Sequence, residues 1–438
     1  MRKLPIFLLS ITACSMLAYN LDEILDLSRE RDPGYQSKML KFAANKQAAV
    51  IAIGKSLPAL TLSLTGTQTS TAPNVTNRSS KLKLASTIPL YNPENLHTHR
   101  AGKIKTEKAQ LDERSFQTTH ILSIAESYFA ALSAQAAYQS NLTATKRYQK
   151  SYEESLELEK AGLKTHVDTL VSLSAYDNSQ VDAVSAKNKL SHTLNTLEGK
   201  IDASVSSLNA YQQETIPDLP VEPIEALFSH ALTQGSKIAK ARLSLKTSDE
   251  NLSHAESKFL PSLSLTIGMS QTLAQLQEGF LHEDHTDVET SLAVSMNVFN
   301  GFSDYHRVRQ KALAYQASLE ELKNETYNIK LDIEKSYQNF TNTKLKASAS
   351  LSAMKSAKAS LDAVSEQYQA GTTTELELLT AISRSTASQQ GYYESIYQYF
   401  QSYLQLKASA SMLNDTAIAD ISQLLRLETV LQSTTDPS

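Results

Sequence analysis

The chain has 438 residues, a formal net charge of −4, a single cysteine and no tryptophan. The near-neutral charge offers no electrostatic case for nucleic-acid binding, and one cysteine excludes an internal disulfide. With only 12 glycines and 11 prolines, the composition favours long helices over a compact α/β enzyme.

The N-terminal residues 1–18 have the pattern of an export signal. Arg2 and Lys3 precede a short apolar stretch and a run of small residues, which predicts a secretory signal peptide cleaved after Ala18. The apolar stretch is too short to form a permanent membrane helix. The alternative is a lipoprotein signal, in which the sequence ITAC makes Cys14 the lipid-bearing N-terminus of the mature chain.

Segments that alternate apolar and polar residues predict β-strands in two pairs. They span residues 59–69, 81–90, 262–270 and 291–299. Each has about the length of a tilted transmembrane strand, and aromatic residues gather near the strand ends, where outer-membrane barrels carry aromatic girdles. One interpretation is two hairpins packed on helices in a soluble domain. The other is a barrel shared by several chains, because four strands are too few to close a barrel that spans a membrane.

The remainder of the chain predicts helices, two of them very long. Residues 94–160 contain no proline and one glycine, so about 100 Å of continuous helix is expected. Residues 303–369 contain neither glycine nor proline and form its counterpart. Each long helix stops at a related phrase, AGLKT or AGTTT, whose glycine is typical of a helix C-terminus. Further helices are predicted over residues 166–198 and 375–412.

The order of these elements occurs twice. KSLPALTL before the first strand pair and KFLPSLSL before the second introduce the same series of helix, strand, strand, very long helix, turn and helix. A tandem duplication is therefore predicted. Its first copy spans residues 19–222 and ends in a linker, its second copy spans residues 223–412, and residues 413–438 form a C-terminal tail.

With its duplicated order of elements, its LPxLxL phrases and its two AG-x-x-T turns, the chain resembles the TolC family of outer membrane efflux proteins. The resemblance implies a mainly α fold with a β-barrel part. Three protomers would each give four strands to one 12-stranded transmembrane barrel, and their long helical hairpins would form a tunnel across the periplasm. The implied location is the outer membrane of a Gram-negative bacterium, in contact with its lipid.

The resemblance also implies a function. The homotrimer would be the exit duct of a tripartite efflux or type I secretion system, exporting small molecules or proteins. Its partners would be a periplasmic adaptor and an inner-membrane pump, driven by protons or by ATP. The cargo does not follow from the resemblance.

By the same resemblance, the two turns would form the periplasmic end of the tunnel and contact the adaptor. The alternative is plain helix-hairpin turns. The candidate contacts are Ala161, Gly162, Leu163, Lys164, Thr165, Ala370, Gly371, Thr372, Thr373 and Thr374.

Acidic residues just past the turns would ring the closed aperture in this family. Asp168 and Glu377 occupy matching positions after Gly162 and Gly371. A threefold ring of carboxylates in a narrow throat would attract cations. The alternative is an ordinary first-turn acid, which the helix dipole favours.

The sequence departs from the family pattern where a latch would close the aperture. Thr373 stands where a basic residue would clasp the neighbouring helix, and Thr380 stands where a second acid would lie. A salt bridge of that kind is therefore not expected. Lys164 is the nearest base that could replace it.

No arrangement of residues indicates an enzyme. We find no catalytic triad, carboxylate pair or phosphate loop with suitable spacing, and no cofactor or metal site is predicted. His97 and His99, and the cluster at residues 282–285, resemble metal ligands by composition alone. The cluster at 282–285 lies in a predicted external loop, where a solvated acidic cluster is the expected interpretation. Two other classes stay open: an exported periplasmic coiled-coil scaffold or adaptor, and a secreted helical protein.

Overall fold

The computed structural model describes residues 19–71, 75–205, 207–277, 280–282 and 286–425. The predicted signal peptide, with Cys14, lies outside these residues. The described residues fold as two compact units. The tip unit comprises those within Met1–Lys38, Phe116–Thr233 and Ile329–Ser438, and the strand unit comprises those within Met39–Ser115 and Gln234–Asn328.

Two very long helices contribute residues to both units. Helix α4 spans Pro93–Lys160 and α8 spans Ser303–Gln369, which confirms both predicted long helices almost to the residue. The predicted repeats, 19–222 and 223–412, therefore describe the order of elements along the chain, whereas the compact units cut across that order. Among the described helices, none combines the length and the apolar character needed to cross a membrane.

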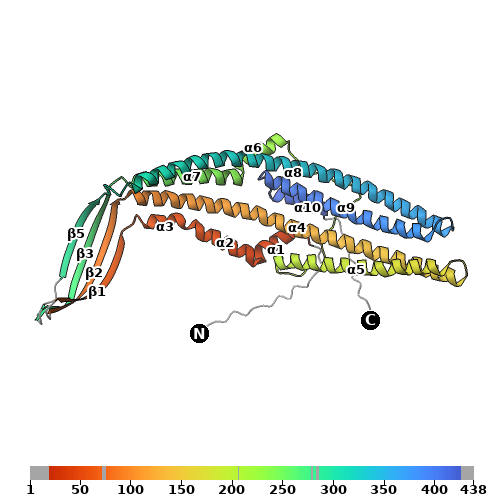
Figure 1. The fold of residues 1–438 in the computed structure, drawn as a ribbon, viewed down its shortest axis with the longest axis horizontal. Helices are drawn as coiled ribbons and strands as arrows, with labels where there is room; N and C mark the ends of the chain where they lie inside the picture. The colour runs from red at the N-terminus through yellow and green to blue at the C-terminus, as the bar shows by residue number, and fades with distance from the viewer. Residues whose placement is uncertain (1–18, 72–74, 206, 278–279, 283–285, 426–438) are drawn as a thin grey trace, which may run out of the picture. The chain divides into compact units, whose positions relative to one another are not determined.

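Each long helix turns back into a shorter one within the tip unit. Helix α5, His166–Ile201, follows α4, and helix α9, Glu375–Ser409, follows α8. Helix α5 runs past its predicted end at 198, and α9 stops before its predicted end at 412. The turns of the two hairpins lie at the same end of the tip unit (Figure 1).

Shorter helices precede each strand pair. Before the first pair the chain forms α1, Leu21–Arg31, α2, Pro33–Lys46, and α3, Ala48–Gly54. Before the second pair it forms α6, Ile224–Gln234, and α7, Ser236–Ser257. Pro33 opens α2, where its missing N–H leaves no hydrogen bond unmade.

The strand unit contains one antiparallel sheet, built from strands that are longer than the alternation predicts. They are β1, Ala59–Thr71; β2, Val75–Tyr91; β3, Ser262–Gln277; β4, Phe280–His282; and β5, Thr286–Ser295. β2 and β3 lie in the centre, β1 pairs with β2, and β4 and β5 both pair with β3 (Figure 1). Between the predicted strands 262–270 and 291–299, the described residues of 271–290 are therefore strand. The Gln and Thr residues of this segment hide the alternation.

The predicted strand 291–299 is wrong at both ends. The strand in the structure begins at Thr286 and ends at Ser295, so residues 296–299 lie outside it. The chain then bends toward α8 through Gly301 and Phe302, whose φ angles are +55° and +60°. A strand cannot continue through such a bend.

Register places apolar and polar residues on opposite faces of this sheet. Leu265 of β3 pairs with Leu292 of β5, and Leu263 pairs with Val294. Leu60, Leu62 and Leu64 alternate along β1 with threonine and serine, and all three leucines are about 70% exposed (71%, 69% and 67%). In the described chain, this sheet therefore presents an uncovered apolar face.

The predicted C-terminal tail, residues 413–438, is wrong for residues 415–425. These form helix α10, Asp415–Leu425, which buries Ile418, Ile421 and Leu425. Asn414 caps it, since its side-chain oxygen accepts the N–H of Ala417 at 3.1 Å. The spacing of apolar residues is that of an amphipathic helix. Residues 426–438 lie outside the described chain.

Tyrosines hold the predicted linker between the repeats against α9. The hydroxyl of Tyr392 donates to the carbonyl of Gln213 at 2.8 Å, and that of Tyr399 donates to Pro217 at 3.2 Å. Both tyrosine side chains are fully buried in the core of the tip unit. The linker is therefore a packed part of that unit.

Candidate functional site at the hairpin turns

The two hairpin turns share one backbone design. Gly162 and Gly371 have φ angles of +74° and +72°, a left-handed conformation that glycine adopts without steric cost. The next N–H in each turn reaches back to the helix, from Leu163 to the Leu158 carbonyl at 2.8 Å and from Thr372 to the Gln367 carbonyl at 2.9 Å. This is the Schellman arrangement that ends a helix.

Each following helix begins with a capping box. Thr165 and Asp168 exchange side-chain-to-backbone hydrogen bonds at the start of α5, and Thr374 and Glu377 do the same at the start of α9. The Thr165 hydroxyl holds the pKa of Asp168 below its usual range, and the Thr373 hydroxyl does the same for Glu377. Both predicted ring acids therefore stay charged at neutral pH, each within its own turn.

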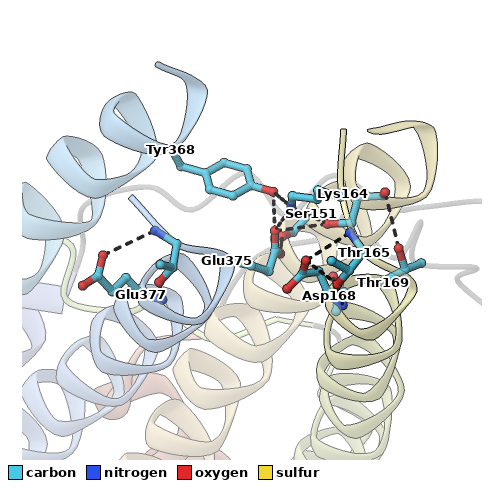
Figure 2. Close-up of polar contacts among 11 residues, drawn as sticks. Ser151, Lys164, Thr165, Asp168, Thr169, Tyr368, Glu375 and Glu377 are labelled. Atoms are coloured by element: carbon cyan, nitrogen blue, oxygen red, sulfur yellow. Dashed lines mark hydrogen bonds and ion pairs between the residues drawn. The ribbon is translucent and has the colours of Figure 1, made fainter. Parts of the chain in front are cut away.

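A buried ion pair joins the two hairpin turns. Lys164, in the turn after α4, donates to the carboxylate of Glu375, the first residue of α9. Their side chains are only 16% and 6% exposed. Figure 2 shows these two side chains converging from different hairpins.

Three hydroxyls complete the coordination of this pair. Ser151 donates to one carboxylate oxygen of Glu375, and Tyr368 donates to the other (Figure 2). Ser155 donates to the same oxygen as Tyr368, at 3.1 Å. The Lys164 ammonium also donates to Ser155 at 3.0 Å and lies 4.7 Å from the ring centre of Tyr368. The pair thus has the additional hydrogen bonds that a buried salt bridge needs to offset its desolvation.

The pKa shifts of Glu375 and Lys164 indicate that the hydrogen bonds and charge attraction within the pair outweigh the cost of burying the two charges. Burial by itself would raise the pKa of Glu375, yet the hydrogen bonds from Lys164, Ser151 and Tyr368 bring it below the ordinary value. Burial would lower the pKa of Lys164, and the bonds to Glu375 and Tyr368 raise it instead. Both partners are therefore charged at neutral pH.

An apolar cluster supports the ion pair from inside the tip unit. Leu361 of α8, Leu378 and Ile382 of α9, and Ala144 of α4 are buried together, and Tyr368 packs against them. Tyr368 therefore links the apolar contact between the hairpins to the charged contact at their turns.

A groove of about 560 Å³ lies beside the turns, between α5 and α9. Its lining includes Val167, Leu170, Val171, Leu376 and Leu379. Leu163, in the turn itself, is 74% exposed. The end of the tip unit therefore presents an apolar surface next to two charged acids.

The structure separates the predicted site residues into two groups. The carboxylates of Asp168 and Glu377 accept hydrogen bonds within their own capping boxes, Asp168 half-buried and Glu377 exposed, and most of the predicted adaptor contacts in both turns are exposed. Lys164 differs from that group, because its side chain lies inward against Glu375. Thr380, where a second acid would stand, donates its hydroxyl to the Leu376 carbonyl at 2.6 Å.

Sequence reasoning missed Glu375 and the role of Tyr368. Glu375 reads as an ordinary first-turn acid, and Tyr368 reads as part of a coiled-coil seam. One signal was available in the comparison of the two turns. Lys164 has an uncharged counterpart in Thr373, and Glu375 has His166. Opposite charges that each appear in only one copy indicate a contact between the copies.

Comparison with known proteins shows which family the chain belongs to. The chain is 25% identical to the outer membrane protein TolC of Vibrio cholerae serotype O1, with 97% of this chain and 98% of that protein aligned. It is 21% identical to the alkaline protease secretion protein AprF of Pseudomonas aeruginosa, over 89% of this chain and 84% of that protein.

The fold is also that of a solved channel. The CmeC outer membrane channel of Campylobacter jejuni superposes with a TM-score of 0.74 at 16% identity, covering 93% of this chain and 89% of that one. The sequence pattern of the family described as Outer membrane efflux protein matches residues 24–201 and 227–411, one segment in each repeat. The chain therefore belongs to the outer membrane efflux protein family.

Proposed function

We propose that this chain is the exit duct of a tripartite efflux or type I secretion system, working as a homotrimer with a periplasmic adaptor and an inner-membrane pump. The observation that carries the proposal is the family match across both repeats, together with the paired hairpin turns. The named relatives are outer membrane and secretion proteins, which supports a channel and not an enzyme.

The free edges of the sheet support a trimer. In the described chain β1 pairs with β2 alone and β5 with β3 alone, so both outer strands have an open side. Open strand edges pair with other chains unless they are blocked. Three copies, each giving four long strands, would close a barrel with the leucines of β1 toward lipid and the serine and threonine face toward water.

The mass of the detergent-extracted particle tests this assembly. After correction for bound detergent, we expect a mass of about three chains, and extraction should require detergent. A monomer that stays in solution without detergent would contradict the channel and favour an exported helical scaffold.

The apolar groove beside the turns supports adaptor docking. An adaptor that buries a leucine-sized side chain there would gain about 1.5–3 kcal/mol for each such contact. Leu163, Val167 and Leu376 are exposed, and the charged Asp168 and Glu377 flank them. The turns and this groove together form the proposed adaptor surface.

A charged residue placed in the apolar groove tests the adaptor surface. Leu376→Asp should weaken binding of the purified adaptor by about tenfold or more, since the loss of one such contact exceeds about 1.4 kcal/mol. Leu345→Asp, at an exposed position of α8 away from the turns, is the matched control and should bind normally. Equal affinity of both variants for the adaptor would show that the groove is not part of the adaptor-binding surface.

The Lys164–Glu375 pair supports a latch within each protomer. It joins the end of one hairpin to the end of the other, where the family pattern would place a base at Thr373. Removing one member of a buried ion pair costs about 3–5 kcal/mol, because the remaining charge stays buried. We infer that separation of the hairpin ends, and so opening of the duct, requires this pair to break.

Variants of the pair test the latch. Glu375→Gln and Lys164→Met should each speed amide hydrogen exchange in the turns and raise the conductance of the reconstituted channel. The double variant should show a smaller change than the sum of the two, since neither charge is left unpaired. Glu377→Gln, two residues further along α9 and outside the pair, serves as the control for exchange. Unchanged exchange and conductance in both single variants would exclude the latch.

Glu377 supports an acidic ring at the aperture. Its carboxylate is exposed, and its lowered pKa keeps it charged as the pH falls, until the pH passes through that pKa, below the ordinary value of 4.5. Glu377→Gln should lower the cation preference of the reconstituted channel without affecting trimer assembly, since glutamine also completes a capping box.

The pH dependence provides a second measurement on the same ring. The wild-type cation preference should be constant near neutral pH and decline only in acid, where the carboxylates protonate. Glu320→Gln, an exposed acid on α8, should leave selectivity unchanged. Selectivity that is the same for Glu377→Gln and the wild type would reject the ring.

A further inference from the structure

The helices of the strand unit follow the same order as its strands. Gly102 of α4 lies against α3, and Glu94 of α4 pairs with Lys258, directly after α7, at 3.0 Å. Ser248 of α7 and Ser318 of α8 share a hydrogen bond of 2.6 Å. The order is therefore α3, α4, α7 and α8. Helix α3, which leads into the outer strand β1, and helix α8, which follows the outer strand β5, are the two ends of this row (Figure 1).

The end of the row at α3 carries an exposed stripe with coiled-coil spacing. Its members along α2 and α3 follow one another at steps of four, three, four and three residues, and all of them are exposed: Leu40, Ala44, Gln47, Ile51 and Gly54. This spacing is typical of a helix face that packs against another helix. The stripe therefore indicates a helical neighbour at this edge.

The stripe ends in a gap between apolar side chains. Val50, Ile53 and Leu57 are exposed around Gly54, and a Cβ placed on Gly54 would meet no other part of the described chain within 4 Å. In a coiled coil, four residues with this spacing form the hole that receives one side chain of the facing helix. We call Val50, Ile53, Gly54 and Leu57 the α3 hole.

The opposite end of the row begins with a phenylalanine in a backbone conformation that it disfavours. Phe302 has a φ angle of +60°, where a bulky residue is a rare outlier and glycine is the usual choice. Its carbonyl accepts the N–H of His306 at 3.1 Å, so Phe302 is also the N-cap of α8, a place that favours serine, threonine, asparagine or aspartate. In the first repeat, Asn92 accepts the N–H of Glu94 at 2.9 Å in the corresponding place. Neither the backbone nor the cap explains a phenylalanine.

Burial within the chain does not explain Phe302 either. The residue is 67% exposed, and its ring packs edge-to-face on Phe299, at 5.3 Å between ring centres and an angle of 89°. Phe299 is itself 71% exposed. Strain that is kept without an internal contact indicates a contact outside the chain. Because both residues follow the outer strand β5, that contact lies at the edge where another protomer would join.

The strand directions show what would meet Phe302 at this edge. Strands β1 and β3 run one way, and β2 and β5 run the other. A second protomer in the same orientation continues this alternation if its β1 lies beside β5. Its α3 then lies beside α8 of the first protomer. Gly54 precedes β1 by five residues and Phe302 follows β5 by seven, so both lie close to the sheet.

The charges on the two edges are complementary. Between Met39 and Pro58 the only charged residues are lysines, whereas α8 carries acids at comparable distances from the sheet. Lys55 and Asp304 each lie next to the sheet on their own edge. Lys41 and Glu321 lie farther away, by 14 and 17 residues. An α3 edge and an α8 edge that pack together would therefore bring opposite charges to the same level at both ends.

We propose that Phe302 of one protomer fills the α3 hole of the next, and that the strained backbone of Phe302 is retained for this contact. The inference rests on the proposed homotrimer and adds the place where one protomer holds its neighbour. Phe302 and the α3 hole are different surfaces of one chain, so the contact is head-to-tail. Head-to-tail contacts that close produce a ring.

An exchange of side-chain size tests the contact. Phe302→Gly empties the hole and relieves the strain, so the trimer in detergent should dissociate at least about tenfold faster, a factor that corresponds to about 1.4 kcal/mol. Gly54→Leu fills the hole from its own side and should also speed dissociation. Its own chain should accept the leucine, because Gly54 has no positive φ and open space beside it. The double variant should dissociate more slowly than either single variant.

A matched control separates this contact from a general loss of apolar surface. Leu84→Ala removes an exposed leucine from the central strand β2, away from both edges, and should leave the dissociation rate unchanged. Dissociation rates equal to the wild type in both Phe302→Gly and Gly54→Leu would overturn the proposal.

Cysteine cross-linking gives a second measurement that does not depend on stability. Cys14 is the only cysteine, so a Cys14→Ser chain can carry a single introduced pair. Phe302→Cys with Leu57→Cys should give covalent dimers and trimers on mild oxidation in detergent, whereas Phe302→Cys with Leu84→Cys should give none. Phe302→Cys with Val50→Cys probes the other side of the hole. The absence of cross-linked chains with both hole positions would overturn the proposal.

The mass of the particle separates failure of this contact from failure of the channel. A mass of three chains, without cross-linking and with unchanged dissociation, would overturn the contact and leave the channel intact. A monomer would overturn both. Lipid as the occupant is tested with Phe302→Trp, since the chain contains no tryptophan. Loss of its emission in vesicles of brominated phosphatidylcholine would assign Phe302 to lipid and overturn the contact between protomers.

Discussion

The assembly depends on one constraint: the backbone hydrogen bonds along the outer edges of the two outer strands must find partners. The outer strands of the described sheet, β1 and β5, each leave one side without a strand partner, and the apolar face between them is uncovered. In lipid an unpaired backbone group costs several kcal/mol, so a sheet there must close on itself. One chain has too few strands for that.

The long elements could be predicted from sequence because their signals are local. The runs without proline, with one glycine in the first and none in the second, predicted α4 and α8, and a glycine after each run marked the turn. The strands were predicted too short because polar residues such as Gln271 and Thr286 obscure the alternation near the loop, although backbone pairing continues there. Helix α10 was missed because residues 413–438 were read as a tail on the evidence of a single proline near their end.

The site shows the limit of such reasoning more clearly. Asp168 and Glu377 were found because they occupy the same place in two similar turns, and each makes its hydrogen bonds within its own turn. Lys164 and Glu375 lie more than 200 residues apart, as their numbers show, and meet only after both hairpins have packed. Whether an acid at a helix start serves its own helix or another hairpin depends on tertiary structure. The sequence of one copy does not carry that information.

The asymmetry of the two turns decides whether the duplicated chain could be divided into two halves that each assemble alone. Repeats that stay alike can in principle be separated again, so that two copies of a half-length chain replace each full-length one. Here one copy carries only the base of the ion pair and the other carries only the acid. A ring made from either half alone would bury lysines without carboxylates, or carboxylates without lysines. The two halves are now complementary. A gene that encoded only one of them would produce a chain without a partner for its buried charge.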